Sequence, residues 1–212
     1  MFNYKKLYEI QDFLKKNSKL TKIIAISKNQ TKESVIDAIK CGVSIFGENR
    51  VQEAINKFKD LKETYPDLEL HLTGPLQSNK VKLAIPIFDI FHTLDREKIA
   101  REFFKHKNEI TNKKFFIQVN TGQEDSKSGI YISYLNEFLN FCQHDMSLNI
   151  VGLMCIPPIN EDPRIHFKKL KLLAEKNNLN ELSIGMSGDY LEALDFNPSY
   201  IRLGTILFGK RN

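Results

Sequence analysis

One lysine, Lys28, comes directly after a short apolar run that ends at Ser27. If that run is a buried strand, the amine of Lys28 lies at the strand's carboxyl end, open to solvent yet beside apolar neighbours. Partial desolvation lowers the pKa of such an amine and makes it nucleophilic toward aldehydes, with which amines form Schiff bases. The alternative is an ordinary surface lysine, because the 212-residue chain carries 31 Lys and Arg residues. Position alone leaves both interpretations open.

Two turns near the C-terminus have the composition of a phosphate site. Ser187 and Gly188 precede a helix predicted from Tyr190. Gly204 and Thr205 follow the last apolar run of the chain. Small residues expose backbone N–H groups, and the amino end of a helix adds partial positive charge, so such turns attract anions. We therefore predict that these four residues hold a phosphate group, the alternative being two ordinary tight turns.

Other polar groups also follow apolar runs. Asn49 comes after the run at residues 43–46, where it either faces a ligand or caps the next helix, since Asn is a favoured N-cap. His71 alternates with Leu70 and Leu72, so its ring is expected to point into the interior. There the ring either packs in the core or lies near a bound ligand.

The elements that must position these residues alternate along the chain. Strands are predicted at residues 22–27, 43–46, 68–73, 88–92, 114–120, 150–154, 182–184 and 200–203. Amphipathic helices are predicted between them at 31–40, 50–64, 98–107, 133–143 and 163–177, with Asp95 as the N-cap of the helix at 98–107. An amphipathic helix also opens the chain.

This alternation predicts a parallel sheet, and eight units favour a closed barrel. A Rossmann fold is disfavoured because no glycine occurs between Lys22 and Ser34, where its fingerprint would begin. The predicted fold is α/β, a single (β/α)8 TIM barrel with an extra N-terminal helix, spanning residues 1–212 as one domain. In such barrels the site lies at the carboxyl ends of the strands, with phosphate bound after strands seven and eight.

Composition excludes several classes of protein. Hydrophobic residues make up 42% and charged residues 27%, which is typical of a globular domain and excludes a disordered chain. The net charge of +5 comes from lysines spread over all the helices, which gives no nucleic-acid-binding stripe. No apolar run is long enough to span a membrane, and no signal peptide opens the chain. Three widely spaced cysteines form no metal or disulfide pattern, so we expect a cytoplasmic protein.

The strand-end residues together suggest one ligand. Lys28 after strand one faces the predicted phosphate turns across the barrel mouth. A ligand that carries both an aldehyde and a phosphate is pyridoxal 5′-phosphate (PLP). Arg202, on the last strand, then becomes a candidate partner for the pyridine nitrogen of PLP.

Several segments resemble those of the YggS/PROSC family of PLP homeostasis proteins. They are IAISKNQ, FGENRVQEA, HLTGPLQSNKVK, FIQVNTGQEDSKSGI, IVGLMCIPP, LSIGMSGDYLEA and IRLGTILFG, in order along nearly the whole chain. Departures from the family pattern occur at Thr73, at Pro75 and at residues 29–30, and they remove no group that the ligand needs. The resemblance implies a barrel like the N-terminal domain of alanine racemase.

The resemblance also implies roles for individual residues. Lys28 would hold PLP as a covalent aldimine, and Arg202 would face the ring nitrogen. Asn49 would lie near the cofactor, with Met154 and His71 flanking its ring. The phosphate would be held by Ser187, Gly188, Gly204 and Thr205.

The function implied is binding, buffering or delivery of PLP, with little or no turnover and no assigned catalytic residue. PLP is a strong electron sink when its ring nitrogen is protonated, and an arginine, which only donates, keeps that nitrogen unprotonated. Alanine racemase tolerates this arginine but takes a second base, a tyrosine, from an additional domain, for which we expect 212 residues to leave no room. We expect a monomer that passes PLP to apo PLP-dependent enzymes.

Two other functions stay open at this point. One is a weak PLP enzyme, such as an amino-acid racemase, that takes its second base from Lys127, Tyr131 or His71. The other is a phosphate-binding barrel enzyme in which Lys28 forms a Schiff base with a sugar aldehyde.

Overall fold

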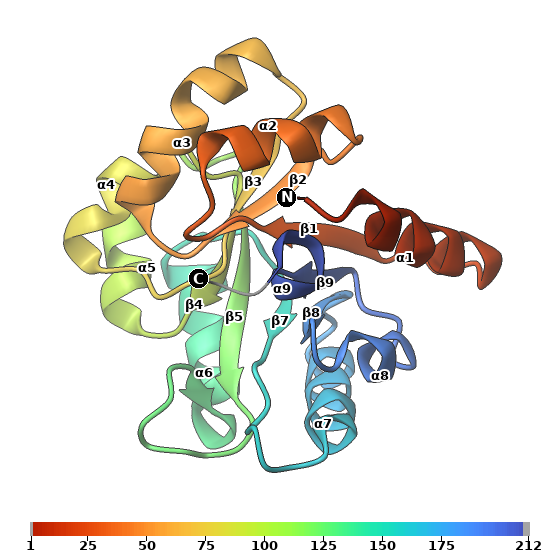
Figure 1. Ribbon diagram of the computed structural model, residues 1–212. Coiled ribbons are helices and arrows are strands. Elements are labelled where there is room, and N and C mark those ends of the chain that lie inside the picture. The colour runs from red at the N-terminus through yellow and green to blue at the C-terminus, as the bar shows by residue number, and fades with distance from the viewer. Residues whose placement is uncertain (1, 210–212) are drawn as a thin grey trace.

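Eight parallel strands close into a cylinder in the computed structural model, which describes residues 2–209 (Figure 1). Neighbouring strands pair in the order β4-β3-β2-β1-β9-β8-β7-β5, and pairing of β4 with β5 closes the ring. The strands are β1 (Lys22–Ile26), β2 (Ile45–Glu48), β3 (Glu69–Leu72), β4 (Ile90–Leu94), β5 (Lys114–Asn120), β7 (Ile150–Met154), β8 (Glu181–Met186) and β9 (Tyr200–Leu203).

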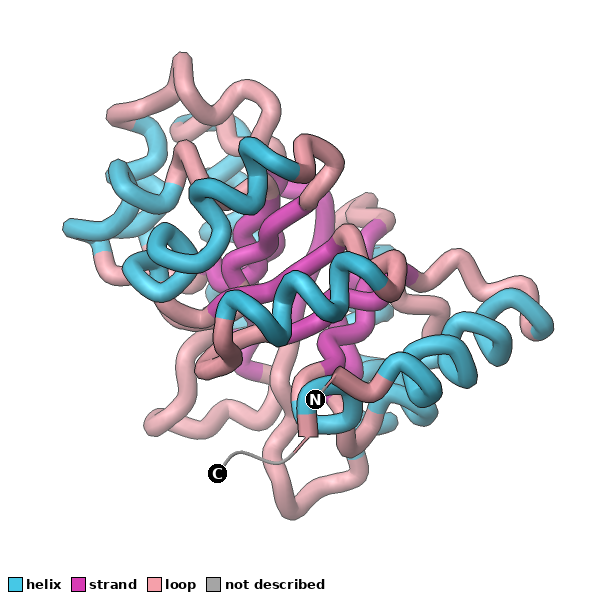
Figure 2. Tube along the Cα trace, turned by 45° about the horizontal axis from the view of Figure 1, so that its top comes forward, coloured by secondary structure: helices cyan, strands magenta, loops and turns pink. Residues whose placement is uncertain are grey.

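Helices surround the cylinder, as the tube view in Figure 2 shows. They are α1 (Tyr4–Lys16), α2 (Lys32–Lys40), α3 (Val51–Thr64), α4 (Val81–Ala84), α5 (Glu97–Phe104), α6 (Leu135–Asn140), α7 (Pro163–Lys176), α8 (Tyr190–Leu194) and α9 (Thr205–Phe208). Because every strand pair is parallel, all the carboxyl ends of the strands open at the same end of the barrel. None of the helices in residues 2–209 is both long and apolar enough to cross a membrane.

The predicted TIM barrel and its eight strands are confirmed, with differences at the ends of some elements. The two-residue strand β6 (Ile130–Tyr131), which pairs with the end of β5, was not predicted. Asp95 was predicted as an N-cap, and this is wrong: α5 begins at Glu97, and Arg96 takes the cap position with an extended backbone. The carboxylate of Asp95 pairs instead with the Arg96 guanidinium. Of the predicted domain, residues 1 and 210–212 lie outside the described residues.

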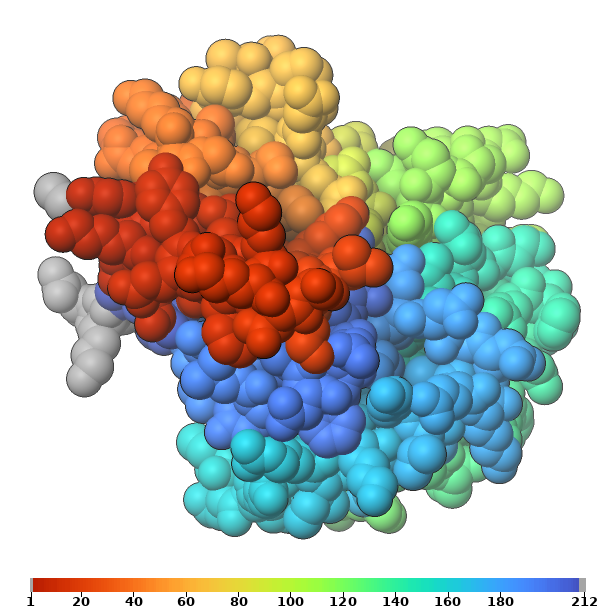
Figure 3. Space-filling model, turned by 90° about the vertical axis from the view of Figure 1, so that its right-hand side faces the viewer, coloured from red at the N-terminus to blue at the C-terminus, as the bar shows by residue number. Residues whose placement is uncertain are grey.

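The predicted N-terminal helix is confirmed as α1, which packs against the last strand–helix unit. The Phe2 and Phe208 rings lie 5.1 Å apart, and the Asn3 N–H donates to the Leu207 carbonyl at 2.7 Å. Figure 3 shows this red segment lying against blue C-terminal residues. The residues that lead into α1 therefore pack against α9.

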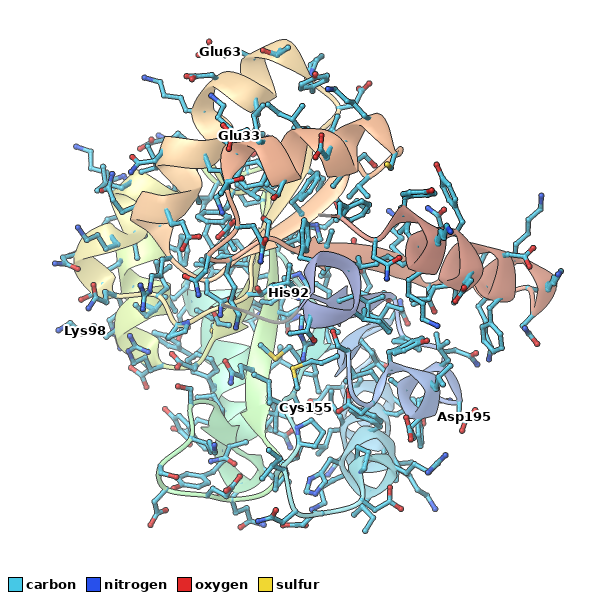
Figure 4. The ribbon with its side chains drawn as sticks, viewed as in Figure 1. Glu33, Glu63, His92, Lys98, Cys155 and Asp195 are labelled. Atoms are coloured by element: carbon cyan, nitrogen blue, oxygen red, sulfur yellow. The ribbon has the colours of Figure 1, made fainter. Side chains whose placement is uncertain are left out.

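Two apolar clusters fill the protein. The larger one lies between strands and helices, and the smaller one joins interior side chains of five strands: Ile24, Ile90, Phe116, Met154 and Tyr200. His92 and Cys155, both fully buried, lie near the centre of the molecule in Figure 4, whereas Glu63 and Lys98 lie at its edge. The barrel interior is thus packed with apolar side chains below the mouth.

Candidate cofactor site

A cavity of about 250 Å³ opens at the carboxyl ends of the barrel strands. Its walls come from segments at the ends of β1, β2, β3, β7, β8 and β9: Ile26, Lys28, Asn49, Thr73, Ile156, Met186, Ser187, Gly188, Arg202, Gly204 and Thr205. Seven of the nine residues predicted to bind the cofactor line this cavity. The structure thus brings together groups that are up to 177 positions apart in the sequence.

Lys28 is presented by a tight turn just after β1. The Gln30 N–H donates to the Ser27 carbonyl at 3.0 Å, and Asn29 between them adopts φ +59°. Asn tolerates this left-handed conformation better than most residues do. The turn leaves Lys28 partly buried, and its side chain lines the cavity.

Arg202 is held rigidly on β9, the strand that pairs directly with β1. The prediction that Lys28 faces the turn after the last strand across the mouth is therefore wrong, because these two strands are neighbours. Its guanidinium donates from Nη1 to the Ser183 carbonyl at 2.7 Å and to the Ser183 hydroxyl at 2.8 Å. Nη2 donates to the Cys155 carbonyl at 2.9 Å. Only 4% of the residue is exposed, and burial lowers the pKa of its guanidinium. Because arginine titrates far above neutral pH, a fixed, permanent hydrogen-bond donor faces the cavity.

The two predicted phosphate turns meet on one side of the cavity. The Ser187 hydroxyl oxygen accepts from the N–H groups of Gly204, at 3.2 Å, and Ile206, at 3.4 Å. These backbone donors therefore converge on an oxygen at the cavity wall. A Cβ added at Gly188 would meet no atom within 4 Å, so glycine there keeps the space open. Converging donors beside an open space fit a phosphate group.

Asn49 belongs to the cavity rather than to the helix that follows it. Helix α3 has Arg50 as its N-cap, without a side-chain hydrogen bond. The Thr73 hydroxyl donates to Oδ1 of Asn49 at 3.1 Å. This contact fixes the amide, so its NH₂ group is the remaining donor toward a ligand.

Comparison with known proteins identifies the family. The family described as alanine racemase, N-terminal domain, matches residues 6–212. A pyridoxal phosphate homeostasis protein of Vibrio alginolyticus is 37% identical over 201 residues, which cover 90% of this chain and 86% of that protein. The chain belongs to the pyridoxal phosphate homeostasis protein family.

Solved structures agree with this family assignment. The structure of PipY from Synechococcus elongatus with PLP bound is similar to the present structure, with a TM-score of 0.87 and 32% sequence identity. The match covers 97% of this chain and 99% of PipY. Alanine racemase from Corynebacterium glutamicum has a TM-score of 0.70 at 16% identity, covering 99% of this chain and 62% of the racemase. The racemase therefore shares the barrel fold with the homeostasis family.

Two residues predicted to flank the cofactor ring, His71 and Met154, do not line the cavity of this family member. Both are fully buried in the barrel interior, Met154 within the smaller apolar cluster. The residues that line the cavity are Thr73, two positions after His71, and Ile156, two positions after Met154. A strand advances about 3.3 Å per residue, so His71 lies about 7 Å deeper than Thr73.

His71 instead belongs to a buried chain of hydrogen bonds. Its Nε2 lies 2.7 Å from Oε1 of Glu69, and its Nδ1 lies 2.8 Å from Nε2 of His92. Because a carboxylate only accepts, Nε2 of neutral His71 donates, Nδ1 accepts and the His92 Nε2–H donates. Nδ1 of His92 is then an acceptor, and it is buried without a partner. Burial lowers the pKa of both imidazoles, and the nearby Arg202 charge lowers that of His92 further.

The buried histidines predict a loss of stability in mild acid. As pH falls below about 6.5, the imidazoles take up protons in the unfolded chain before they do so in the fold, so the free energy of unfolding falls as pH falls. The loss is up to about 1.4 kcal/mol per pH unit for each histidine. Urea unfolding at pH 7.5 and 5.5 measures it.

Two variants test the origin of this loss. His92→Phe, which keeps an aromatic ring stacked on Phe116, should reduce the acid-induced loss by about half. His144→Gln, at an exposed position, should leave it unchanged. An equal loss in all three proteins would show that other groups cause it.

Four cavity residues were not predicted: Ile26, Thr73, Ile156 and Met186. Thr73 and Met186 stand at strand ends, so the strand-end rule itself was a signal for them. Ile156 lines the cavity with 47% of the residue exposed. No sequence signal separated Ile26 from an ordinary core residue.

Proposed function

We propose that this protein binds PLP in the cavity at the barrel mouth and takes part in PLP homeostasis, with Lys28 as the covalent attachment point. The observation that carries the proposal is that one cavity is lined by an amine, by a fixed guanidinium and by turns whose backbone N–H groups converge on one oxygen. The family assignment supports it, because relatives are named pyridoxal phosphate homeostasis proteins and the PipY structure has PLP bound. These relatives favour PLP over a sugar aldehyde as the ligand.

The proposed attachment is a Schiff base. Lys28 would hold PLP through its unprotonated Nζ, which would condense with the aldehyde of PLP; the two protons of the amine would leave with the aldehyde oxygen as water. Ser187, Gly188, Gly204 and Thr205 hold the phosphate, and Arg202 donates to the ring nitrogen. Bound PLP supplies an electron-withdrawing ring, which stabilises negative charge at an attached carbon.

The residues that line the cavity favour a protein that holds PLP over an enzyme that racemises amino acids. Arg202 cannot accept a proton, so it leaves the ring nitrogen unprotonated and the electron sink weak. Among the described residues that line the cavity, Lys28 and Arg202 are the ionisable ones. The three other bases considered, Lys127, Tyr131 and His71, do not line it. The Tyr131 hydroxyl donates to Asp125 at 2.6 Å.

Further parts of the proposal concern the setting of the protein. We propose a single PLP-binding domain that acts in the cytoplasm as a monomer and passes PLP to apo PLP-dependent enzymes. Cys41, Cys142 and Cys155 are free thiols, which fits a reducing compartment. Burial raises the pKa of Cys142 and Cys155 to about 12, so these two behave as packing residues.

Removal of the two hydroxyls at the phosphate turns should weaken PLP binding. Hydrogen bonds to a charged group contribute about 1.5–3 kcal/mol each, so the loss of two in Ser187→Ala with Thr205→Ala should raise the Kd for PLP about 100-fold or more. Equilibrium dialysis measures this Kd. Ser133→Ala, at an exposed position, is the control and should bind as the parent protein does. An unchanged Kd in the double variant would place the phosphate elsewhere.

Transfer of the cofactor tests the proposed function itself. The holoprotein is mixed with an apo PLP-dependent enzyme, and the return of that enzyme's activity is followed. We expect reactivation without racemase or transaminase activity of the holoprotein alone. Sustained turnover of an amino acid at about 1 s⁻¹ or faster, which is ordinary for enzymes, would overturn the idea of a carrier.

A further inference from the structure

A buried cluster of charged side chains lies behind the turn that carries Lys28. Nζ of Lys57, on α3, lies 2.8 Å from Oε1 of Glu48 on β2 and 3.0 Å from Oε1 of Glu53. The exposed fraction of the side chain is 6% for Lys57, 0% for Glu48 and 23% for Glu53. None of the three lines the cofactor cavity.

The cluster binds both neighbours of Lys28. On the amino side, the Ser27 hydroxyl donates to Glu48 at 2.6 Å, and Nζ of Lys57 donates to the Ser27 carbonyl at 2.7 Å. On the carboxyl side, the Asn29 N–H donates to Oε1 of Glu53. The backbone on either side of Lys28 is therefore fixed by one ammonium and two carboxylates.

Stability alone does not explain such a cluster. Burial of charges costs several kcal/mol per ion, and apolar side chains of similar volume are often as stable or more stable. Glu48 shows the cost, because its Oε2 is buried without a partner and burial raises the pKa of its carboxyl group. An apolar packing of α3 on β2 would lack donors and acceptors for Ser27 and Asn29. The cluster thus supplies the hydrogen-bond partners of Ser27 and Asn29, which apolar side chains cannot supply.

We propose that Lys57 is a positioning residue for Lys28: by bridging Glu48, Glu53 and the Ser27 carbonyl, it sets the turn so that the Lys28 amine meets the aldehyde of bound PLP. This inference rests on the proposed function. The cluster controls the rate and extent of covalent attachment of PLP to Lys28, whereas the phosphate turns and Arg202 hold the cofactor noncovalently. A small misplacement of reacting groups can slow a reaction by as much as about 100-fold.

The test separates covalent capture from binding. PLP is mixed with apoprotein, and the rate at which the Schiff-base absorption appears is measured. Pyridoxamine 5′-phosphate, which has an amine in place of the aldehyde, measures noncovalent affinity. Lys57→Met should slow capture about tenfold or more and leave pyridoxamine phosphate affinity within about twofold. Lys59→Met, on an exposed position of the same helix, is the matched control and should capture as the parent does.

A second variant covers the case in which Lys57→Met does not fold. Glu53→Ala removes the acceptor of the Asn29 N–H from a partly exposed position and should also slow capture at constant pyridoxamine phosphate affinity. The inference is overturned if folded variants capture PLP at the parental rate, or if both ligands weaken in parallel. If the parent protein itself forms no Schiff base, the proposed function fails instead, so the two failures are distinguishable.

Discussion

Lys28→Ala should abolish the Schiff-base absorption of the protein mixed with PLP. Of the described residues that line the cavity, Lys28 is the one whose amine can condense with an aldehyde, since the Arg202 guanidinium stays protonated. The variant should still bind pyridoxamine 5′-phosphate, because the phosphate turns and Arg202 are unchanged. Absorption spectroscopy and dialysis measure the two binding effects.

Lys127→Ala is the control for this prediction. Lys127 is exposed on the loop after β5 and does not line the cavity, so its removal should leave the Schiff-base absorption intact. Persistence of the absorption in Lys28→Ala and its loss in Lys127→Ala would move the attachment point to that loop.

Arg202→Gln should lower both the stability of the protein and its hold on the cofactor. The substitution removes the hydrogen bonds that Nη1 and Nη2 of Arg202 donate to the carbonyls of Ser183 and Cys155, and each buried hydrogen bond lost without replacement costs about 1–3 kcal/mol. It also replaces the permanent cation that is proposed to face the ring nitrogen with a neutral amide, which should shift the absorption spectrum of bound PLP. Urea unfolding and absorption spectroscopy measure the two effects.

Arg164→Gln provides the comparison for Arg202→Gln. Arg164 is 54% exposed and lies 3.9 Å from Asp195, so the free energy of unfolding should change by at most about 0.5 kcal/mol. If Arg202→Gln destabilised the protein but left the spectrum of bound PLP unchanged, Arg202 would support the fold without facing the ring.

The position of the cavity could be predicted because a closed parallel barrel brings all carboxyl strand ends to one mouth. That rule selects Lys28 together with Ser187 and Thr205, although Lys28 lies near the start of the chain and the other two lie near its end. Depth along a strand was harder to predict, because His71 and Thr73 point to the same side of β3 and only the register decides which of them reaches the mouth. The same holds for Met154 and Ile156 at the end of β7.

The support behind Lys28 could not be predicted from the local sequence. Glu48 stands one residue before Asn49, yet its carboxylate contacts α3 while Asn49 lines the cavity. The i, i+4 spacing of Glu53 and Lys57 is that of an ordinary pair on a helix surface. Only the packing of α3 on β2 buries Lys57 and brings it to the Ser27 carbonyl.

The central claim is that PLP is held covalently on Lys28. The measurement that tests it most directly is reduction of the holoprotein with borohydride, which converts a Schiff base into a stable secondary amine, followed by peptide mass mapping. We predict that the phosphopyridoxyl group is found on Lys28 in the parent protein and on no peptide of Lys28→Ala. A phosphopyridoxyl group on another lysine, with Lys28 unmodified, would contradict the claim.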